Sequence, residues 1–268
     1  MSALLVALPM YLGAPDAVQD LWIHLREALR AQGMQGLPEA IVWPQDLHAH
    51  WLSSGLLLGQ TCGYPLTHGL QGKVQLVGGF HYAAPGCEGL DCRSVLIARE
   101  EHAHLALQDF RGLRVAFNSS DSQSGYNALR ALVAPLAQGG AFFGGTLETG
   151  GHRQSIDAVR QARADLAAID CVTWALLQKY APQAAHGLQT IGCSAPYPGL
   201  PLICALGTQN HVVTALQRAL CDLLQSPAAR PCLDALLIRG YESPTLSVYQ
   251  RCLDMERTAL AQGYPILA

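Results

Sequence analysis

Residues 113–174 contain two helix starts, Asp121-Ser122-Gln123-Ser124-Gly125-Tyr126 and Gly150-Gly151-His152-Arg153, each directly after a strand-like run. A helix N-terminus presents unpaired backbone N–H groups and the positive end of the helix dipole. Small hydroxyl and glycine residues at that position let an oxyanion approach closely. Because the two starts are near each other in the chain, we expect them to share one anionic ligand.

The composition limits the classes of protein that the chain can form. Of its 268 residues, 50% are hydrophobic and 14% are charged, so it can bury a substantial core as one large domain or as two lobes. The net charge is −3 and no run of Lys and Arg occurs, which argues against a nucleic-acid-binding surface. The low charge favours a small ligand.

No apolar stretch reaches the roughly 18–20 residues that a membrane-spanning helix needs. The N-terminal residues 1–9 are apolar but lack a basic leader, so they predict a buried strand rather than a secretory signal. As the sequence stands, this indicates a cytoplasmic chain, whereas a periplasmic location would follow if a leader had been removed.

The nine cysteines include no C-x-x-C pair and no zinc-like spacing. Most are expected to be buried thiols that behave as small apolar residues. A disulfide between Cys87 and Cys92 is sterically possible but is not the expected state. Many thiols favour a reducing compartment, and the sequence predicts no metal site.

Strand-like and helix-like segments alternate in the first part of the chain. An apolar run at residues 4–8 precedes a segment that predicts an amphipathic helix ending before Gly33, with Val18, Leu21, Trp22, Leu25 and Leu29 at helical spacing. Strands are expected at residues 40–43, 56–59, 73–78 and 93–98, and a short helix at Pro44 and Asp46.

The alternation restarts after residue 113. It predicts strands at residues 114–117, 142–148, 166–169 and 188–193, and helices at 124–136, around Ile156 and Val159, and at 172–180. Three prolines make 194–201 a connection, followed by a strand at 202–205 and helices at 212–223, 232–237 and 245–262. This pattern predicts an α/β fold with mostly parallel sheets, whose ligands bind at the carboxyl ends of strands.

Several segments, taken in order, carry a resemblance to a known family. They are Leu113-Arg114-Val115-Ala116-Phe117-Asn118, the run at 121–126, Gly151-His152 and Ala164-Asp165-Leu166-Ala167-Ala168-Ile169-Asp170, with weaker likeness at 60–64 and 86–89. In this combination the chain resembles the phosphonate, phosphite and phosphate type of solute-binding proteins that serve ABC transporters.

The resemblance implies a type II periplasmic-binding-protein fold, in which two α/β lobes joined by two crossover strands close on a ligand in an interlobe cleft. The first lobe is then expected at residues 1–94 and 194–268, and the second at 95–193. Hinged closure of the lobes is the implied motion.

The resemblance places the oxyanion on Ser122, Gln123 and Ser124, through hydroxyl and backbone N–H donors, with His152 at the next helix start. The chemistry agrees, because phosphonate and phosphate accept many short hydrogen bonds and charge-assisted bonds are strong. A histidine at a helix N-terminus should also lose its proton more readily while the site is empty.

Each of these residues has a plainer interpretation as well. Ser122 and Ser124 are common N-cap residues, and a lone His152 is more often a surface or capping residue. Asp170 either accepts a hydrogen bond from the ligand or holds a neighbouring loop. Thr173 either donates to the ligand or caps a helix. Their joint occurrence in the family-like order favours ligand binding.

The resemblance also implies ligand contacts from the first lobe. Tyr11 follows the first strand, and Gln60, Thr61 and Tyr64 follow the strand at residues 56–59. For Tyr11 and Tyr64, an aromatic ring at the edge of the core is an equally good interpretation.

Two departures from the family pattern narrow the ligand. Binders of aminoalkyl phosphonates are expected to carry an acidic residue in the proline-rich connection, and residues 194–201 contain none. This argues against an amino-substituted ligand. Cys92 stands where an aromatic is expected before Arg93-Ser94-Val95, which implies a wider pocket.

Three functional classes remain. The first is a solute-binding protein for a phosphonate, phosphite or phosphate-like oxyanion, with an ABC permease as its partner. The second is an enzyme on the same scaffold that acts on a small organic acid, since His152 and Asp170 could do acid/base work. The third is a cytosolic ligand sensor. The resemblance favours the first, without a catalytic residue, cofactor or metal.

Overall fold

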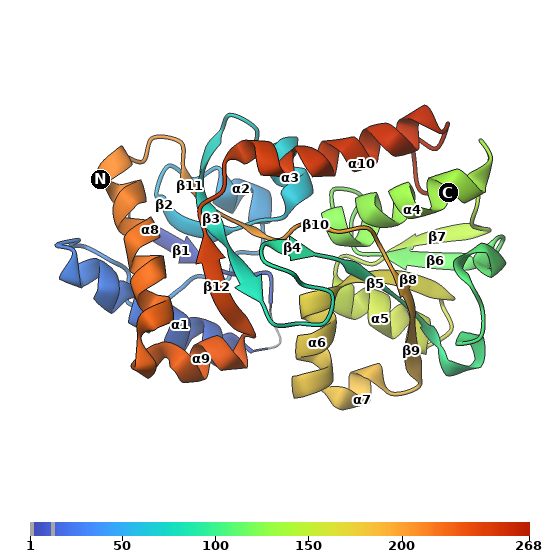
Figure 1. Cartoon of the computed structure of the whole chain (residues 1–268), viewed down its shortest axis with the longest axis horizontal. Helices are drawn as coiled ribbons and strands as arrows, with labels where there is room; N and C mark the ends of the chain where they lie inside the picture. The colour runs from blue at the N-terminus through green and yellow to red at the C-terminus, as the bar shows by residue number, and fades with distance from the viewer. Residues whose placement is uncertain (1–2, 12–13) are drawn as a thin grey trace. The chain divides into compact units, whose positions relative to one another are not determined.

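The computed structural model describes residues 3–11 and 14–268, and the chain forms two compact units (Figure 1). The first unit comprises Met1–Ala83, Glu88–Leu90 and Gly199–Val248. The second comprises Ala84–Cys87, Asp91–Pro198 and Tyr249–Ala268. Within the described ranges, no helix is both long and apolar enough to cross a membrane.

The first unit contains a mixed sheet in the order β1-β2-β11-β3-β12, with helices packed on it. Its strands are β1 (Leu5–Ala7), β2 (Leu56–Gln60), β3 (Val74–Tyr82), β11 (Pro201–Ala205) and β12 (Ile238–Glu242). Its helices are α1 (Pro15–Ala31), α2 (Leu47–Trp51), α3 (Gly63–Thr67), α8 (Asn210–Gln225), η4 (Pro227–Ala229) and α9 (Arg230–Ala235).

Helix α1 forms as its apolar spacing predicts. Pro15 occupies its first turn, where a missing N–H costs nothing, and the chain leaves the helix through Gly33, whose φ of 85° suits glycine. The apolar face is buried and packs against α8 and α9; it consists of Val18, Leu21, Trp22, Leu25 and Leu29.

The strand predicted at residues 40–43 is absent from the described chain. Val42 and Trp43 are exposed, and only Ile41 of the apolar side chains there is buried. The Val42 N–H donates one hydrogen bond to the Val6 carbonyl, 2.8 Å away, but no ladder follows. The nearby Pro44 removes a backbone donor, which limits further pairing.

The second unit is built around a mixed sheet in the order β7-β6-β8-β5-β9. Its strands are β4 (Asp91–Cys92), β5 (Ser94–Arg99), β6 (Arg114–Phe117), β7 (Gly145–Glu148), β8 (Leu166–Asp170), β9 (Leu188–Cys193) and β10 (Tyr197–Pro198). Its helices are η1 (Glu100–His102), η2 (Leu107–Phe110), the π-helical turn η3 (Gln123–Asn127), α4 (Ala128–Ala137), α5 (His152–Arg160), α6 (Cys171–Tyr180), α7 (Pro182–Ala185) and α10 (Gln250–Ala261), which the turn η5 (Leu246–Tyr249) precedes.

Both five-stranded sheets are mixed, and β4 and β10 form a separate two-stranded antiparallel sheet, so the prediction of mostly parallel sheets is wrong. Strands β1 and β2 are parallel, as are β6 with β7 and β8. By contrast, β11 runs antiparallel to β2 and β3, and β5 runs antiparallel to β8 and β9. Strands β5 and β11 come soon after the points where the chain passes between units, so their direction does not follow from strand-helix alternation.

The C-terminal segment belongs to the second unit, whereas the sequence placed residues 194–268 in the first. Helix α10 packs along α4, as Figure 1 shows. The Asn127 side-chain amide donates to the Cys252 carbonyl at 2.8 Å, and the Phe142 N–H donates to the Ala268 carbonyl at 2.7 Å. These contacts join residues far apart in sequence, so local patterns could not reveal them.

Candidate functional site

The two predicted helix starts follow neighbouring parallel strands of the second unit. Strands β6 and β7 pair in register from Arg114 to Phe117. Beyond them the Thr149 N–H donates to the Phe117 carbonyl at 2.9 Å, and the Gly150 N–H donates to the Asn118 carbonyl at 2.8 Å. The turns leading to η3 and α5 are therefore tied together at one edge of the sheet.

Ser124 and His152 meet at this edge. The Ser124 Oγ lies 2.8 Å from the His152 Nε2, and the Ser122 Oγ lies 3.5 Å from the Ser124 Oγ. The two helix starts therefore meet, as a shared ligand would require, while ligand binding by these side chains stays a prediction. A small acceptor at this point would meet two hydroxyls and one imidazole.

The backbone of the first helix start is tightly constrained. Ser122 acts as its N-cap, since its hydroxyl accepts a hydrogen bond from the Gly125 N–H at 3.0 Å. A Cβ on Gly125 would lie 1.9 Å from the Asn118 Oδ1, so a side chain at this position would displace that of Asn118. The capping interpretation of Ser122 is therefore correct, whereas the Ser124 hydroxyl points toward His152 instead.

Ser94 bonds to the backbone of Ser124, and Tyr197 contacts Ser94; neither was predicted as a site residue. The Ser94 hydroxyl donates to the Ser124 carbonyl at 2.8 Å, and its oxygen is also 2.8 Å from the Tyr197 Oη. Burial raises the pKa of Tyr197 well above its usual range, so its hydroxyl keeps its proton. Both contacts span long sequence separations, and no local signal marks them.

His152 is held as a neutral ring. Burial lowers its pKa from 6.5 to about 4, because the charged imidazolium loses its hydration. Its buried Nδ1 has no hydrogen-bond partner among residues 3–11 and 14–268. At neutral pH the ring therefore has one N–H donor to share between this nitrogen and the one beside Ser124.

The Gln123 side chain is directed away from Ser124. Its Nε2 donates to the Met255 Sδ at 3.2 Å, and its Oε1 accepts from the Asn127 Nδ2 at 2.9 Å. Both partners belong to the packing of η3 and α4 against α10. Any contribution of Gln123 to anion binding is thus expected from its backbone, as the sequence predicted.

Asp170 caps helix α6. Its carboxylate accepts a hydrogen bond from the Thr173 N–H at 2.8 Å, so Asp170, and not Thr173, is the cap. Burial raises the pKa of Asp170 to about 7. Asp170 also faces Ser94 in the register of β8 and β5, which links it to the strand beneath Ser124. Ligand contact by Asp170 and Thr173 stays a prediction.

The first-unit residues form a cluster of their own. The Tyr11 ring packs edge-on against Tyr82 with centroids 5.3 Å apart, and the Gln60 Nε2 donates to the Tyr82 Oη at 3.2 Å. All three line a small pocket together with apolar side chains. Tyr82 thus joins the two residues that the sequence singled out, although it was not itself predicted.

Thr61 and Tyr64 lie outside that cluster of the first unit. Thr61 is fully buried, its N–H donates to the Pro201 carbonyl at 3.0 Å, and its Oγ1 has no partner among the described residues. Tyr64 lies on α3 and stacks on His68 with centroids 3.9 Å apart. Ligand contact by Tyr11, Gln60, Thr61 and Tyr64 stays a prediction.

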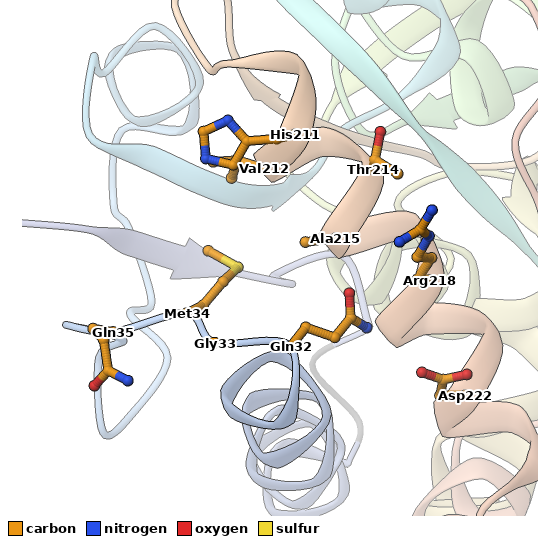
Figure 2. A pocket seen from close by; sticks show the side chains of 10 residues that line it. All are labelled: Gln32, Gly33, Met34, Gln35, His211, Val212, Thr214, Ala215, Arg218 and Asp222. Carbon is orange, nitrogen blue, oxygen red and sulfur yellow. The ribbon is translucent and has the colours of Figure 1, made fainter.

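A larger open pocket of about 980 Å³ lies elsewhere on the first unit, between the end of α1 and helix α8 (Figure 2). Gln32, Met34, His211, Arg218 and Asp222 are among its lining residues. None of the residues predicted to bind ligand lines it. Its volume therefore gives no support to those predictions.

Three of the nine cysteines gather in the second unit, which the sequence spacing did not predict. The sulfurs of Cys87, Cys92 and Cys171 all lie within 4.8 Å of one another. Each thiol is free, and the Sγ atoms of Cys87 and Cys92 lie 3.6 Å apart. Spacing along the chain could not reveal that Cys171, from a distant segment, lies beside them.

Comparison with known proteins gives a family and a fold. The family model described as ABC transporter, phosphonate, periplasmic substrate-binding protein matches residues 83–249, more than half of the chain. No curated protein matches.

Solved structures share the fold at low sequence identity. PhnD1 from Prochlorococcus marinus, in complex with methylphosphonate, superposes with a TM-score of 0.75 at 14% identity, over 97% of this chain and 99% of that one. A Xanthomonas citri protein bound to ATP gives 0.72 at 16%, over 97% and 98%. A binding protein component of a Pseudomonas aeruginosa phosphonate ABC transporter gives 0.72 at 16%, over 97% and 89%.

Proposed function

Because the chain belongs to the family of phosphonate periplasmic substrate-binding proteins of ABC transporters, we propose that its second unit captures a phosphonate, phosphite or phosphate-like oxyanion for an importer. The observation that carries this proposal is the 2.8 Å contact between the Ser124 Oγ and the His152 Nε2, which joins two helix starts. In the proposed complex, Ser122, Ser124 and His152 turn their donors from one another to the ligand oxygens.

The energetics are compatible with capture by neutral groups. Hydrogen bonds to an ionised ligand contribute about 1.5–3 kcal/mol each, so several of them offset the desolvation of the anion. The η3 and α5 helix starts add the positive ends of their dipoles. Because the Ser94 hydroxyl donates to the Ser124 carbonyl at 2.8 Å, the Ser124 backbone is held in place before the ligand arrives.

A bound anion also changes the proton balance of His152. The empty site holds the ring neutral, since burial lowers its pKa to about 4. An ionised ligand oxygen beside Nε2 favours the N–H form at that nitrogen and raises the pKa of the ring. Ligand binding should therefore be accompanied by proton uptake as the pH falls toward the pKa of His152 in the complex.

The pair Ser124 and His152 resembles a nucleophile and its base, but a catalytic triad needs a third group that orients the imidazole. Nδ1 of His152 has no such partner among the described residues. The family is one of transport proteins. We therefore propose ligand capture without turnover, with an ABC permease as the partner that receives the ligand.

Isothermal titration with methylphosphonate, phosphite and phosphate tests the proposal, with sulfate and a small dicarboxylate as controls. We expect one site per chain for at least one phosphorus oxyanion, and a melting temperature that rises with its concentration. ATP, added separately, distinguishes a site for a small oxyanion from one for a nucleotide. Absence of heat and of any thermal shift with all the phosphorus compounds would refute the proposed function.

A further inference from the structure

Three thiols of the second unit lie close together, two of them five residues apart in the chain and the third at the start of α6. The Cys87 Sγ lies 3.4 Å from the Cys171 Sγ and 3.6 Å from the Cys92 Sγ. Cys92 and Cys171 are almost completely buried, while Cys87 is partly exposed. Two residues of the cluster are therefore shielded from water, and the third is partly accessible to solvent.

The backbone around the cluster fixes each sulfur in place. Cys92 pairs with Tyr197 where β4 meets β10. The Cys171 N–H donates to the Arg93 carbonyl at 3.1 Å, which joins the start of α6 to the residue after Cys92. The Cys87 N–H donates to the Ala84 carbonyl at 3.0 Å in a tight turn.

Gly86 lets that turn approach the other cysteines. Its φ is 97°, a conformation that side-chain-bearing residues rarely adopt. A Cβ at this position would lie 3.4 Å from the Cys171 Cβ and 3.6 Å from the Cys171 Sγ. The loop that delivers Cys87 is therefore packed directly on Cys171.

The sulfur separations match those of a thiolate metal site. A Zn–S bond is about 2.3 Å long, so the sulfurs of a tetrahedral site lie about 3.8 Å apart, and those of a trigonal site about 4.0 Å. We propose that Cys87, Cys92 and Cys171 form a three-thiolate site for a soft cation of the Zn(II) or Cu(I) class. Its three sulfurs are distinct from the donors of Ser122, Ser124 and His152 that are proposed for the oxyanion.

The chemistry of the donors decides which cation suits the cluster. The group consists of the sulfurs of Cys87, Cys92 and Cys171. Thiolate ligands select Zn(II) and Cu(I) over harder ions such as Mg(II).

Metal uptake at this site is a proton exchange without oxidation. Each thiol that ligates loses its S–H proton to solvent, and a metal–sulfur bond forms in its place. Zn(II) would complete four-coordination with a further ligand such as water, whereas Cu(I) is satisfied by three sulfurs. A disulfide, by contrast, would use two of the sulfurs, consume an oxidant and leave the third thiol over.

The experiment uses the full chain, reduced with a phosphine and stripped of metal with a chelator. Zn(II) and Cu(I) are titrated separately in competition with chromophoric chelators, and Co(II) serves as a spectroscopic probe of sulfur ligation. We expect one equivalent of Zn(II) or Cu(I) to bind, and Co(II) to show sulfur-to-metal charge-transfer absorption. Each of Cys87→Ser, Cys92→Ser and Cys171→Ser should weaken binding at least about tenfold.

The exposed cysteines provide matched controls. Cys193→Ser and Cys221→Ser change thiols outside the cluster and should leave the metal affinity unchanged. Cys87→Ser, at the partly exposed position, should keep the circular dichroism of the parent even if the two buried variants fail to fold. Failure of the reduced protein to bind either metal, equal affinity in Cys87→Ser, or conversion of the cluster to a disulfide without metal uptake would overturn the proposal.

Discussion

Both units place polar side chains at or just beyond the carboxyl ends of strands, but the chemistry there differs. In the first unit Tyr11, Gln60 and Tyr82 combine large rings with one hydrogen bond of 3.2 Å. In the second, Ser124 and His152 meet through a short hydroxyl at 2.8 Å. The difference teaches that small residues at a helix start leave room for an oxyanion at the backbone, whereas aromatic residues fill the same topological position with apolar surface.

The largest expected effect separates the two clusters by affinity. Ser124→Ala should weaken binding of methylphosphonate or phosphate about 10- to 100-fold, because a hydrogen bond to an ionised group contributes about 1.5–3 kcal/mol. Isothermal titration measures the change. Ser120→Ala, an exposed serine just before the same helix start, is the matched control and should bind like the parent. Equal loss in both variants would contradict the assigned site.

Gly125→Ala tests the rigidity of the second-unit cluster. The added Cβ would lie 1.9 Å from the Asn118 Oδ1, so the Asn118 side chain or the turn must move, and the free energy of unfolding should fall by about 1–3 kcal/mol. Urea denaturation measures it. Gly140→Ala is the control, because the nearest atom there, the Ala137 carbonyl oxygen, is 3.8 Å from the new Cβ. A parent-like midpoint for Gly125→Ala would remove the argument for a preformed site.

A pH series sharpens the account of His152. Its pKa is lowered to about 4 by burial, against 6.5 in the unfolded chain, so between these values the unfolded state binds a proton that the folded state does not. Stability therefore falls as the pH drops from 6.5 toward 4. His152→Asn should reduce the loss of melting temperature between pH 7 and pH 5, whereas His104→Asn, at an exposed position, should not. An unchanged pH dependence in His152→Asn would show that its ring titrates normally.

The smallest effect is expected in the first unit. Tyr82→Phe removes the hydrogen bond from Gln60 and should lower the free energy of unfolding by about 1 kcal/mol. Its effect on oxyanion affinity should be smaller than that of Ser124→Ala. If titration showed the reverse order, the aromatic cluster would be the principal anion site and the contrast between the units would fail.

Local patterns in the sequence predicted much of this molecule. The apolar spacing of Val18 to Leu29 predicted α1. The two Ser- and Gly-rich turns indicated that Ser124 and His152 lie near each other. These features depend on residues close in the chain or on the general rule that carboxyl ends of parallel strands meet.

Features that depend on distant partners could not be predicted from local sequence patterns. Strand β12, which directly follows a predicted helix, was not predicted. Its pairing with β3, rather than its own residue pattern, makes it a strand. Ser94 and Tyr197 support Ser124 from strands that local spacing does not connect to it. The cysteine cluster likewise adds Cys171 to Cys87 and Cys92, and spacing along the chain could not reveal that third member.

The return of Tyr249–Ala268 to the second unit has a consequence for synthesis on the ribosome. Domains generally fold as they emerge, in order from the N-terminus. Here Gly199–Val248, which belongs to the first unit, emerges before α10. The packing of η3 and α4 against α10 can therefore form only after these 50 residues of the first unit have been translated.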